Sequence, residues 1–172
     1  MTRGDQTYIV QGGHAVGARP SDVISTILGS CVAVCLWDAA ARVGGMNHIL
    51  LPDDASGRLG ALSFGASDME RLINALLKRG AERRRFQAKM FGGAAIVTGL
   101  SDIGCQNADF ARGFLKVERI PLVSESVGGR RARQVRFWPA SGRAQVRFVG
   151  RAEVAEPTRP PAPAANDVEL FG

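Results

Sequence analysis

Three apolar segments follow one another early in the chain, joined by connections of only three and five residues. They cover residues 22–28, 32–37 and 43–51, and the first two are rich in β-branched side chains. Runs of this length and composition predict buried strands, and the short connection over residues 38–42 predicts an antiparallel hairpin. The first third of the chain is therefore expected to form adjacent strands of a sheet.

The rest of the sequence predicts both helices and strands. Residues 67–79 are the clearest helix, because Ser67 and Glu70 form a capping box, apolar residues recur at helical spacing, and Gly80 follows. Residues 107–117 predict a second helix. Further strands are predicted over residues 7–10, 86–91, 94–97, 121–126, 133–138 and 144–149, with a glycine-rich link over residues 12–17.

The length of 172 residues is that of one domain. The composition changes after residue 152, since residues 153–172 are Pro-rich, which predicts a disordered tail with polyproline II character. The folded domain is therefore expected over residues 1–152. The closing segment, residues 167–171, combines acidic and apolar residues and could be a short docking peptide, but a frayed end is the favoured interpretation.

Composition and charge argue against several classes of function. The first ten residues hold no apolar signal-peptide core, and no apolar run approaches the ~18 residues of a membrane span, so a cytoplasmic protein without membrane insertion is expected. Three cysteines are an odd number for a disulfide framework. The net charge of +6 comes from scattered arginines without interleaved aromatic residues. This disfavours nucleic acid as a partner and favours a solvated basic face or an acidic protein partner.

A cysteine and a histidine fall on the predicted hairpin where they can meet. Cys31 follows the turn residues Gly29 and Ser30, and His48 lies in the third apolar segment. If the turn centres near residues 39–42, His48 lies opposite a position between Cys31 and Cys35, which share one face of a strand. Strand pairing therefore predicts a Cys–His contact but does not choose between the two cysteines.

A thiol beside an imidazole predicts a nucleophile with its base. A cysteine needs a neighbouring group to become a thiolate, and His14 is the only histidine besides His48. Small residues before a nucleophile let backbone N–H groups approach a substrate and hold an oxyanion. Gly29 and Ser30 are the candidates for that role.

A third group is needed to orient the imidazole. Ser25, six residues before the first cysteine, is the candidate, with Thr26 as its neighbour and Asn47 beside the histidine. The competing interpretation is that a cysteine in an apolar strand is a small buried side chain, and this is favoured for Cys35 and for Cys105. A metal site is not expected, because the cysteines and histidines lack ligand spacing.

Two motifs and several shorter blocks stand in order along the chain. The motifs are residues 28–34 (Leu-Gly-Ser-Cys-Val-Ala-Val) and residues 44–52 (Gly-Gly-Met-Asn-His-Ile-Leu-Leu-Pro). The shorter blocks are Phe64-Gly65 with residues 76–81, residues 88–94, Asp102-Ile103-Gly104 with Asn107, and Val127-Gly128-Gly129 with Arg133. Over about residues 6–150 this pattern resembles the CheD family, the chemoreceptor glutamine deamidases of bacterial chemotaxis.

The resemblance implies a single-domain α/β protein, a layered α/β/β sandwich resembling the catalytic domain of cytotoxic necrotizing factors, with a papain-like Cys–His site. It implies hydrolysis of glutamine side chains to glutamate with release of ammonia, through a thioester on Cys31 and with His48 as the base. The family has a threonine six residues before its cysteine. Ser25 occupies that position here, and Thr26 is the equivalent if the strand shifts by one residue.

The partners that the resemblance implies are the cytoplasmic helices of methyl-accepting chemotaxis receptors, and no cofactor or metal is expected. Gly29, Ser30 and Asn47 are the expected substrate and oxyanion groups. Some family members also bind the CheC phosphatase, so the alternative is a non-catalytic regulator of a CheC-type phosphatase, in which Cys31 and His48 are unused. A cysteine protease on the same dyad is a third interpretation.

Overall fold

The computed structural model describes residues 4–52, 57–96, 102–150 and 168–171, which form two five-stranded sheets and two α-helices. The elements in chain order are β1 (Gln6–Tyr8), β2 (His14–Gly17), β3 (Val23–Leu28), β4 (Val32–Asp38), β5 (Val43–Asn47), α1 (Gly57–Leu77), the 3₁₀ helix η1 (Arg83–Arg85), β6 (Gln87–Gly92), α2 (Asp102–Val117), β7 (Leu122–Val127), β8 (Ala132–Trp138), β9 (Arg143–Val149) and β10 (Val168–Phe171). Neither α-helix of this described part is long and apolar enough to cross a membrane.

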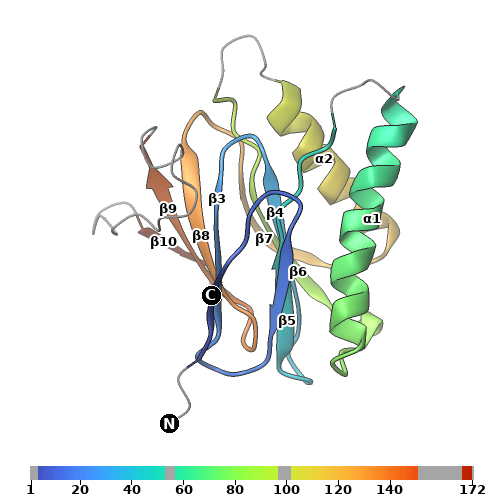
Figure 1. Ribbon diagram of the computed structural model, residues 1–172, viewed down its shortest axis with the longest axis vertical. Coiled ribbons are helices and arrows are strands. Elements are labelled where there is room, and N and C mark those ends of the chain that lie inside the picture. The colour runs from blue at the N-terminus through green and yellow to red at the C-terminus, as the bar shows by residue number, and fades with distance from the viewer. Residues whose placement is uncertain (1–3, 53–56, 97–101, 151–167, 172) are drawn as a thin grey trace.

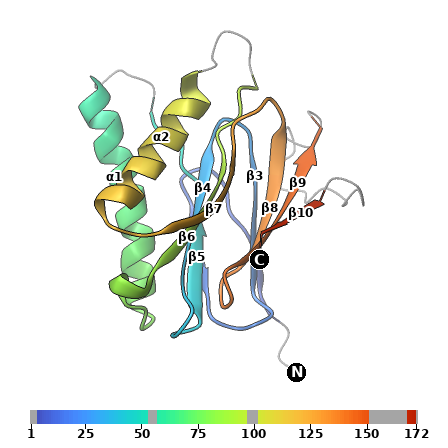
Figure 2. The ribbon, with the colours of Figure 1, turned by 180° about the vertical axis from the view of Figure 1, so that it is seen from behind.

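The two sheets pack face to face, and both helices cover the outer face of one of them (Figure 1). The first sheet has the strand order β1-β3-β8-β9-β10, and the second has the order β2-β5-β4-β6-β7. Viewed from behind, α1 and α2 lie side by side against the second sheet (Figure 2). One apolar cluster, with Phe91 and Phe137, fills the space between the sheets, and another, with Leu72 and Leu115, fills the space under the helices. The central strand β4 is consequently buried on both faces, which explains why it is apolar from Val32 to Trp37.

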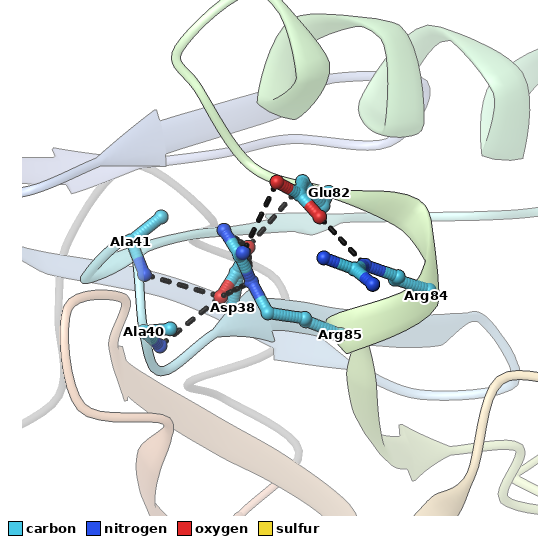
Figure 3. Close-up of polar contacts among 6 residues, drawn as sticks. All are labelled: Asp38, Ala40, Ala41, Glu82, Arg84 and Arg85. Carbon is cyan, nitrogen blue, oxygen red and sulfur yellow. Dashed lines mark hydrogen bonds and ion pairs between the residues drawn. The ribbon is translucent and has the colours of Figure 1, made fainter.

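The predicted hairpin is confirmed as β4 and β5, and an aspartate at its tip holds it together. Four groups donate to the buried Asp38 carboxylate at 2.9 to 3.1 Å: the backbone N–H groups of Ala40, Ala41 and Glu82 and the guanidinium of Arg85 (Figure 3). Burial acts to raise the pKa of Asp38, but the Glu82 and Ala41 N–H groups and Arg85 outweigh it and lower that pKa.

Replacing this carboxylate should destabilise the fold. We expect Asp38→Asn to lower the free energy of unfolding at pH 7 by roughly 2–4 kcal/mol, because Arg85 and the N–H donors lose a buried anion. The folded-state pKa lies below the unfolded one, so the carboxylate stabilises the fold above about pH 4, and this contribution is lost as the pH falls through the folded value. Urea unfolding at pH 7 and pH 3 should therefore show a difference between variant and wild type that shrinks at pH 3.

The matched control for Asp38 is an aspartate on the surface. The side chain of Asp109 is 77% exposed and pairs with Arg112 at 3.3 Å. Exposed ion pairs contribute little to the free energy of unfolding, so Asp109→Asn should leave the urea midpoint nearly unchanged. Equal destabilisation by the two substitutions would contradict a structural role for the buried carboxylate.

Both α-helices begin earlier than the sequence predicts. α1 contains Ser67 in its interior instead of beginning there, and α2 begins more than one turn before residue 107. The first half of α1 is rich in glycine, a weak helix former, so tertiary packing extends the helix against propensity. At Gly65 a Cβ would lie 2.7 Å from the side chains of Leu51 and Phe110, which shows how closely the helix backbone approaches its neighbours.

The strands predicted after residue 85 are confirmed within one residue at each end, except one. Residues 94–96 form no strand, and residue 97 lies outside the described residues. The reason is the positive φ of Gly92 and Gly93, 109° and 64°, which turns the chain out of the sheet. The glycine-rich link predicted over residues 12–17 also differs, since it contains β2, which pairs with β5.

At residues 168–171 the structure differs from the predicted disordered tail over residues 153–172. Val168–Phe171 forms β10, antiparallel to β9. The Phe171 ring meets the Phe91 ring edge-on at 5.5 Å between centroids, and the Phe171 carbonyl accepts a hydrogen bond from Lys89 Nζ. Lys89 is only 2% exposed, so this strand shields a buried cation. Residues 151–167 lie outside the described part.

Candidate active site

The predicted cysteine and histidine lie between the two sheets, at the end where β3 turns into β4. Val32 pairs with Ile49, and Cys35 pairs with Met46. Counting along this antiparallel register places His48 opposite Ala33, midway between the two cysteines. Cys31 and Cys35 are therefore both diagonal neighbours of His48 on one face of the sheet, a separation that side chains can span.

Accessibility distinguishes the two thiols. Cys35 is fully buried beneath the strands, and burial raises the pKa of its thiol. Cys31 is half-buried, packs against the edge of the cluster between the sheets and lies directly before β4. A substrate can reach Cys31 but not Cys35 without opening the sheet, so Cys31 is the candidate nucleophile. The burial expected for Cys35 is confirmed, but that expected for Cys105 is wrong, since Cys105 is exposed on α2, away from this face.

A threonine from the other sheet fixes the imidazole of His48. Thr26 Oγ1 lies 2.8 Å from His48 Nδ1 and also donates to the carbonyl of Ile9 at 2.8 Å. A hydroxyl has one proton, and because the carbonyl can only accept, that proton is committed to Ile9. The Thr26 oxygen must then accept from Nδ1–H. The proton of the neutral imidazole thus resides on Nδ1, and Nε2 carries the lone pair of a base.

The backbone of His48 is held as firmly as its ring. Its N–H donates to the Gly13 carbonyl at 3.1 Å, and its carbonyl accepts from the Gly12 N–H at 2.9 Å. On the other side of the strand, Ile49 exchanges two hydrogen bonds with Val32. Because the backbone and Nδ1 of His48 are all hydrogen-bonded, the imidazole has little freedom to change its orientation.

Burial sets the protonation state of both groups. It raises the pKa of the Cys31 thiol to about 11, with the residue's own backbone N–H acting in the opposite direction. Burial also lowers the pKa of His48 to about 4. Near neutral pH the resting site therefore holds a thiol and a neutral imidazole, so a thiolate forms at Cys31 only if that thiol gives up its proton.

The loop that leads into Cys31 is anchored through its carbonyl groups. The carbonyl of Gly29 accepts from Ala94 N–H at 3.0 Å, and the carbonyl of Cys31 accepts from Gly93 N–H at 2.8 Å. The Ser30 carbonyl between them accepts from the side-chain amide of Asn107 at 2.9 Å. In a planar trans peptide the N–H points opposite to the C=O. The N–H groups of Ser30 and Cys31 are thus turned away from these anchors, as an oxyanion site requires.

Comparison with known proteins identifies the family. A family model described as CheD chemotactic sensory transduction matches residues 50–148. A relative from Caulobacter vibrioides is 51% identical over 98% of this chain and 95% of its own length, and one from Agrobacterium fabrum is 49% identical over 96% of both chains. Both are named Probable chemoreceptor glutamine deamidase CheD. The chain belongs to the CheD family.

Likeness to solved structures is much weaker than this match to CheD sequences. A crystal structure of a Neisseria meningitidis protein assigned to DUF152 has a TM-score of 0.43 and 16% identity, over 73% of this chain and 63% of that one.

The structure of this CheD chain brings some of the predicted site residues together and separates others. Cys31 and His48 share a face, and Gly29 and Ser30 form the anchored loop. Thr26, and not Ser25, meets the imidazole. Ser25 lies on the outer face of the first sheet, because neighbouring residues of a strand point to opposite sides.

Asn47 also differs from its predicted role as an oxyanion or substrate group. Its side chain points to the helix side of the second sheet, where Oδ1 accepts from Val34 N–H at 3.0 Å and Nδ2 lies 3.3 Å from the sulfur of Met69. This amide bridges β4 and β5 beside the histidine. It is a support of the hairpin and does not face the Cys31 side.

Two contributors were missed by sequence reasoning. The Ile9 carbonyl, which sets the direction of the Thr26 hydroxyl, is a backbone atom that no side-chain pattern reveals. Asn107 belongs to one of the motif blocks, but asparagine is common at the start of a helix, where the sequence placed it, so it gave no signal of a role at this site.

Thr26 gives a direct test of the imidazole's orientation. Thr26→Val keeps the shape of the side chain but removes the hydroxyl, so Nδ1 loses its acceptor and the imidazole can turn or exchange its proton. We expect turnover to fall by about 10²-fold. Thr26→Ser keeps the hydroxyl and should stay within about threefold of wild type, and Ser25→Ala should behave the same way. Steady-state kinetics of the three variants would contradict this assignment if Ser25→Ala were the most damaged.

Proposed function

We propose that this chain hydrolyses glutamine side chains of chemoreceptors to glutamate, with Cys31 as nucleophile and His48 as base. The relatives' names and their identity of about half over nearly the whole chain support the activity. The main structural support for this site is the contact of 2.8 Å between Thr26 Oγ1 and His48 Nδ1. It leaves Nε2 as the basic nitrogen of His48, a residue that shares one face of the sheet with Cys31.

In the first half of the reaction, Cys31 Sγ attacks the carboxamide carbon of the glutamine while its proton passes to His48 Nε2. The N–H groups of Ser30 and Cys31 stabilise the oxyanion of the tetrahedral intermediate. The C–N bond then breaks, and the nitrogen takes the proton from His48 and departs as ammonia. A thioester between the substrate and Cys31 remains.

In the second half, water attacks the thioester carbonyl and gives a proton to His48 Nε2. The C–S bond breaks, the thiol of Cys31 recovers its proton from His48, and glutamate is released. The sum is one amide and one water converted to one carboxylic acid and one ammonia. This chemistry needs neither a metal nor a redox cofactor as co-reactant.

The proposed fold is a layered α/β/β sandwich. Helices on one face of a two-sheet sandwich, with a cysteine and a histidine on adjacent strands, support a likeness to the catalytic domain of cytotoxic necrotizing factors. The site differs from a papain-like thiolate–imidazolium pair in one respect. Burial of both groups favours the neutral pair at rest.

The substrates in this proposal are cytoplasmic helices of methyl-accepting chemotaxis receptors, which places the protein in the cytoplasm. A receptor fragment incubated with the protein should gain about 1 Da at each modified glutamine and release an equal amount of ammonia. An unchanged fragment mass would exclude deamidation of that receptor. Binding to a CheC-type phosphatase with no mass change would support the regulator alternative, and cleaved peptides would indicate a protease.

A further inference from the structure

A buried amide links the nucleophile loop to the segment that follows His48. Asn107 lies in α2 and is fully buried. Its Nδ2 donates to the Ser30 carbonyl at 2.9 Å, and its Oδ1 accepts from the Leu51 N–H at 3.0 Å. One side chain thus spans two loops that are far apart from it in the sequence and that flank the candidate site on both sides.

The bond to Ser30 controls the direction of a neighbouring donor. The Ser30 carbonyl and the Cys31 N–H belong to one peptide unit, and its planarity makes them point in opposite directions. If the carbonyl rotates away from α2, the Cys31 N–H rotates with it. The carbonyls of Gly29 and Cys31 are hydrogen-bonded to Ala94 and Gly93. Asn107 is therefore the side chain that fixes the peptide between Ser30 and Cys31.

We infer that Asn107 is a positioning residue, whose side-chain amide holds the Ser30–Cys31 peptide with its N–H directed at the oxyanion of the reaction. It acts through the loop and does not touch the reacting atoms. The inference rests on the proposed function and names a further part of the same site. Burial raises the pKa of the Cys31 thiol, and the Cys31 N–H acts to lower it, which agrees with that direction.

A side-chain amide suits position 107 because one hydrogen bond there needs a donor and the other needs an acceptor. Asparagine donates to Ser30 and accepts from Leu51 at the same time. An aspartate at position 107 would still accept from Leu51, but as a carboxylate it would face the Ser30 carbonyl with an oxygen and repel it. Once protonated, its O–H could donate to Ser30 and restore both bonds. Leucine would fill similar space and make neither bond.

The test compares Asn107→Asp and Asn107→Leu in the full chain by steady-state deamidation of a receptor fragment. At pH 8 both should lower kcat by about 10²-fold with KM within about threefold, because the lost N–H serves the transition state. The activity of Asn107→Asp should recover as the pH falls below about 6, since burial raises the pKa of that carboxyl. Asn107→Leu should show no such recovery.

The control for simple destabilisation is Leu115→Ala, on the same helix two turns away and buried in the cluster under the helices. It should lower the urea midpoint and leave kcat per folded molecule unchanged. Wild-type kcat in Asn107→Asp at pH 8 overturns the inference, as does an equal loss of kcat in Leu115→Ala and Asn107→Leu.

A second readout separates this inference from the proposed function. Alkylation of Cys31 by iodoacetamide, measured by peptide mass spectrometry so that Cys105 is counted apart, needs no glutamine substrate. Asn107→Leu should slow it several-fold, because the Cys31 N–H no longer favours the thiolate. If the wild type fails to deamidate but this slowing is seen, the proposed function fails and the positioning role stands. Alkylation at the wild-type rate overturns the positioning role.

Discussion

Cys31→Ala should abolish ammonia release from receptor fragments, with a loss in kcat of at least about 10⁴-fold. The reason is that Sγ forms the covalent bond to the substrate, and the alanine that replaces it offers no nucleophile. The side chain is small and half-buried, so the free energy of unfolding should change by about 1 kcal/mol or less. Coupled ammonia detection and urea unfolding on the same preparation check both statements.

Two other cysteines make this experiment specific. Cys35 shares the face of Cys31 but is fully buried, so Cys35→Ala should cost about 1 kcal/mol of stability and leave turnover per folded molecule unchanged. Cys105 is exposed on α2, and Cys105→Ser should change neither quantity. If Cys31→Ala keeps full activity, or if Cys35→Ala loses it, the assignment of the nucleophile is wrong.

His48→Gln should lower kcat by about 10³-fold, because neither proton transfer to the leaving ammonia nor activation of water then has a base. Glutamine fills similar space and keeps polar atoms near Thr26 Oγ1, so the sheets should stay together. Single-turnover measurements should show both thioester formation and its hydrolysis slowed. A variant with wild-type turnover would remove His48 from the mechanism.

The same residue sets a distinctive pH dependence. The base must be neutral in the free protein, and burial lowers the pKa of His48 to about 4. The acid limb of the kcat/KM profile should therefore lie near pH 4 and not near the ordinary histidine value of about 6.5. An acid limb near 6.5 would show that the imidazole is solvated in the working protein.

The lowered pKa of His48 should also make the free energy of unfolding depend on pH. Between about pH 6.5 and pH 4 the unfolded chain binds a proton at His48 and the folded chain does not, so stability falls as the pH falls through this window. The shift corresponds to roughly 3 kcal/mol across the window. Urea unfolding of His48→Gln should lack this part of the acid sensitivity, and identical pH profiles for variant and wild type would contradict it.

Local patterns in the sequence were enough to predict the central hairpin and most strands after residue 85. Their residues are β-branched or apolar, and short turns join them, so local preference and tertiary structure agree. Prediction failed where packing opposes preference. The glycine-rich first half of α1 is helical where Gly65 packs closely against Leu51 and against Phe110 of α2. Val168–Phe171 is a strand because β9 offers an edge and Phe91 and Lys89 a surface.

The sequence by itself determined that Cys31 and His48 lie near each other, because a hairpin with a five-residue connection allows few strand registers. The sequence motifs also determined the resemblance to the CheD family. Only the tertiary structure decided which hydroxyl holds the imidazole, which thiol a substrate can reach, and which side chain anchors the loop. Thr26, Ile9 and Asn107 come from three segments that are brought to this site by sheet and helix packing. Contacts between distant segments depend on that packing, and a strand shifted by one residue would have presented Ser25 in place of Thr26.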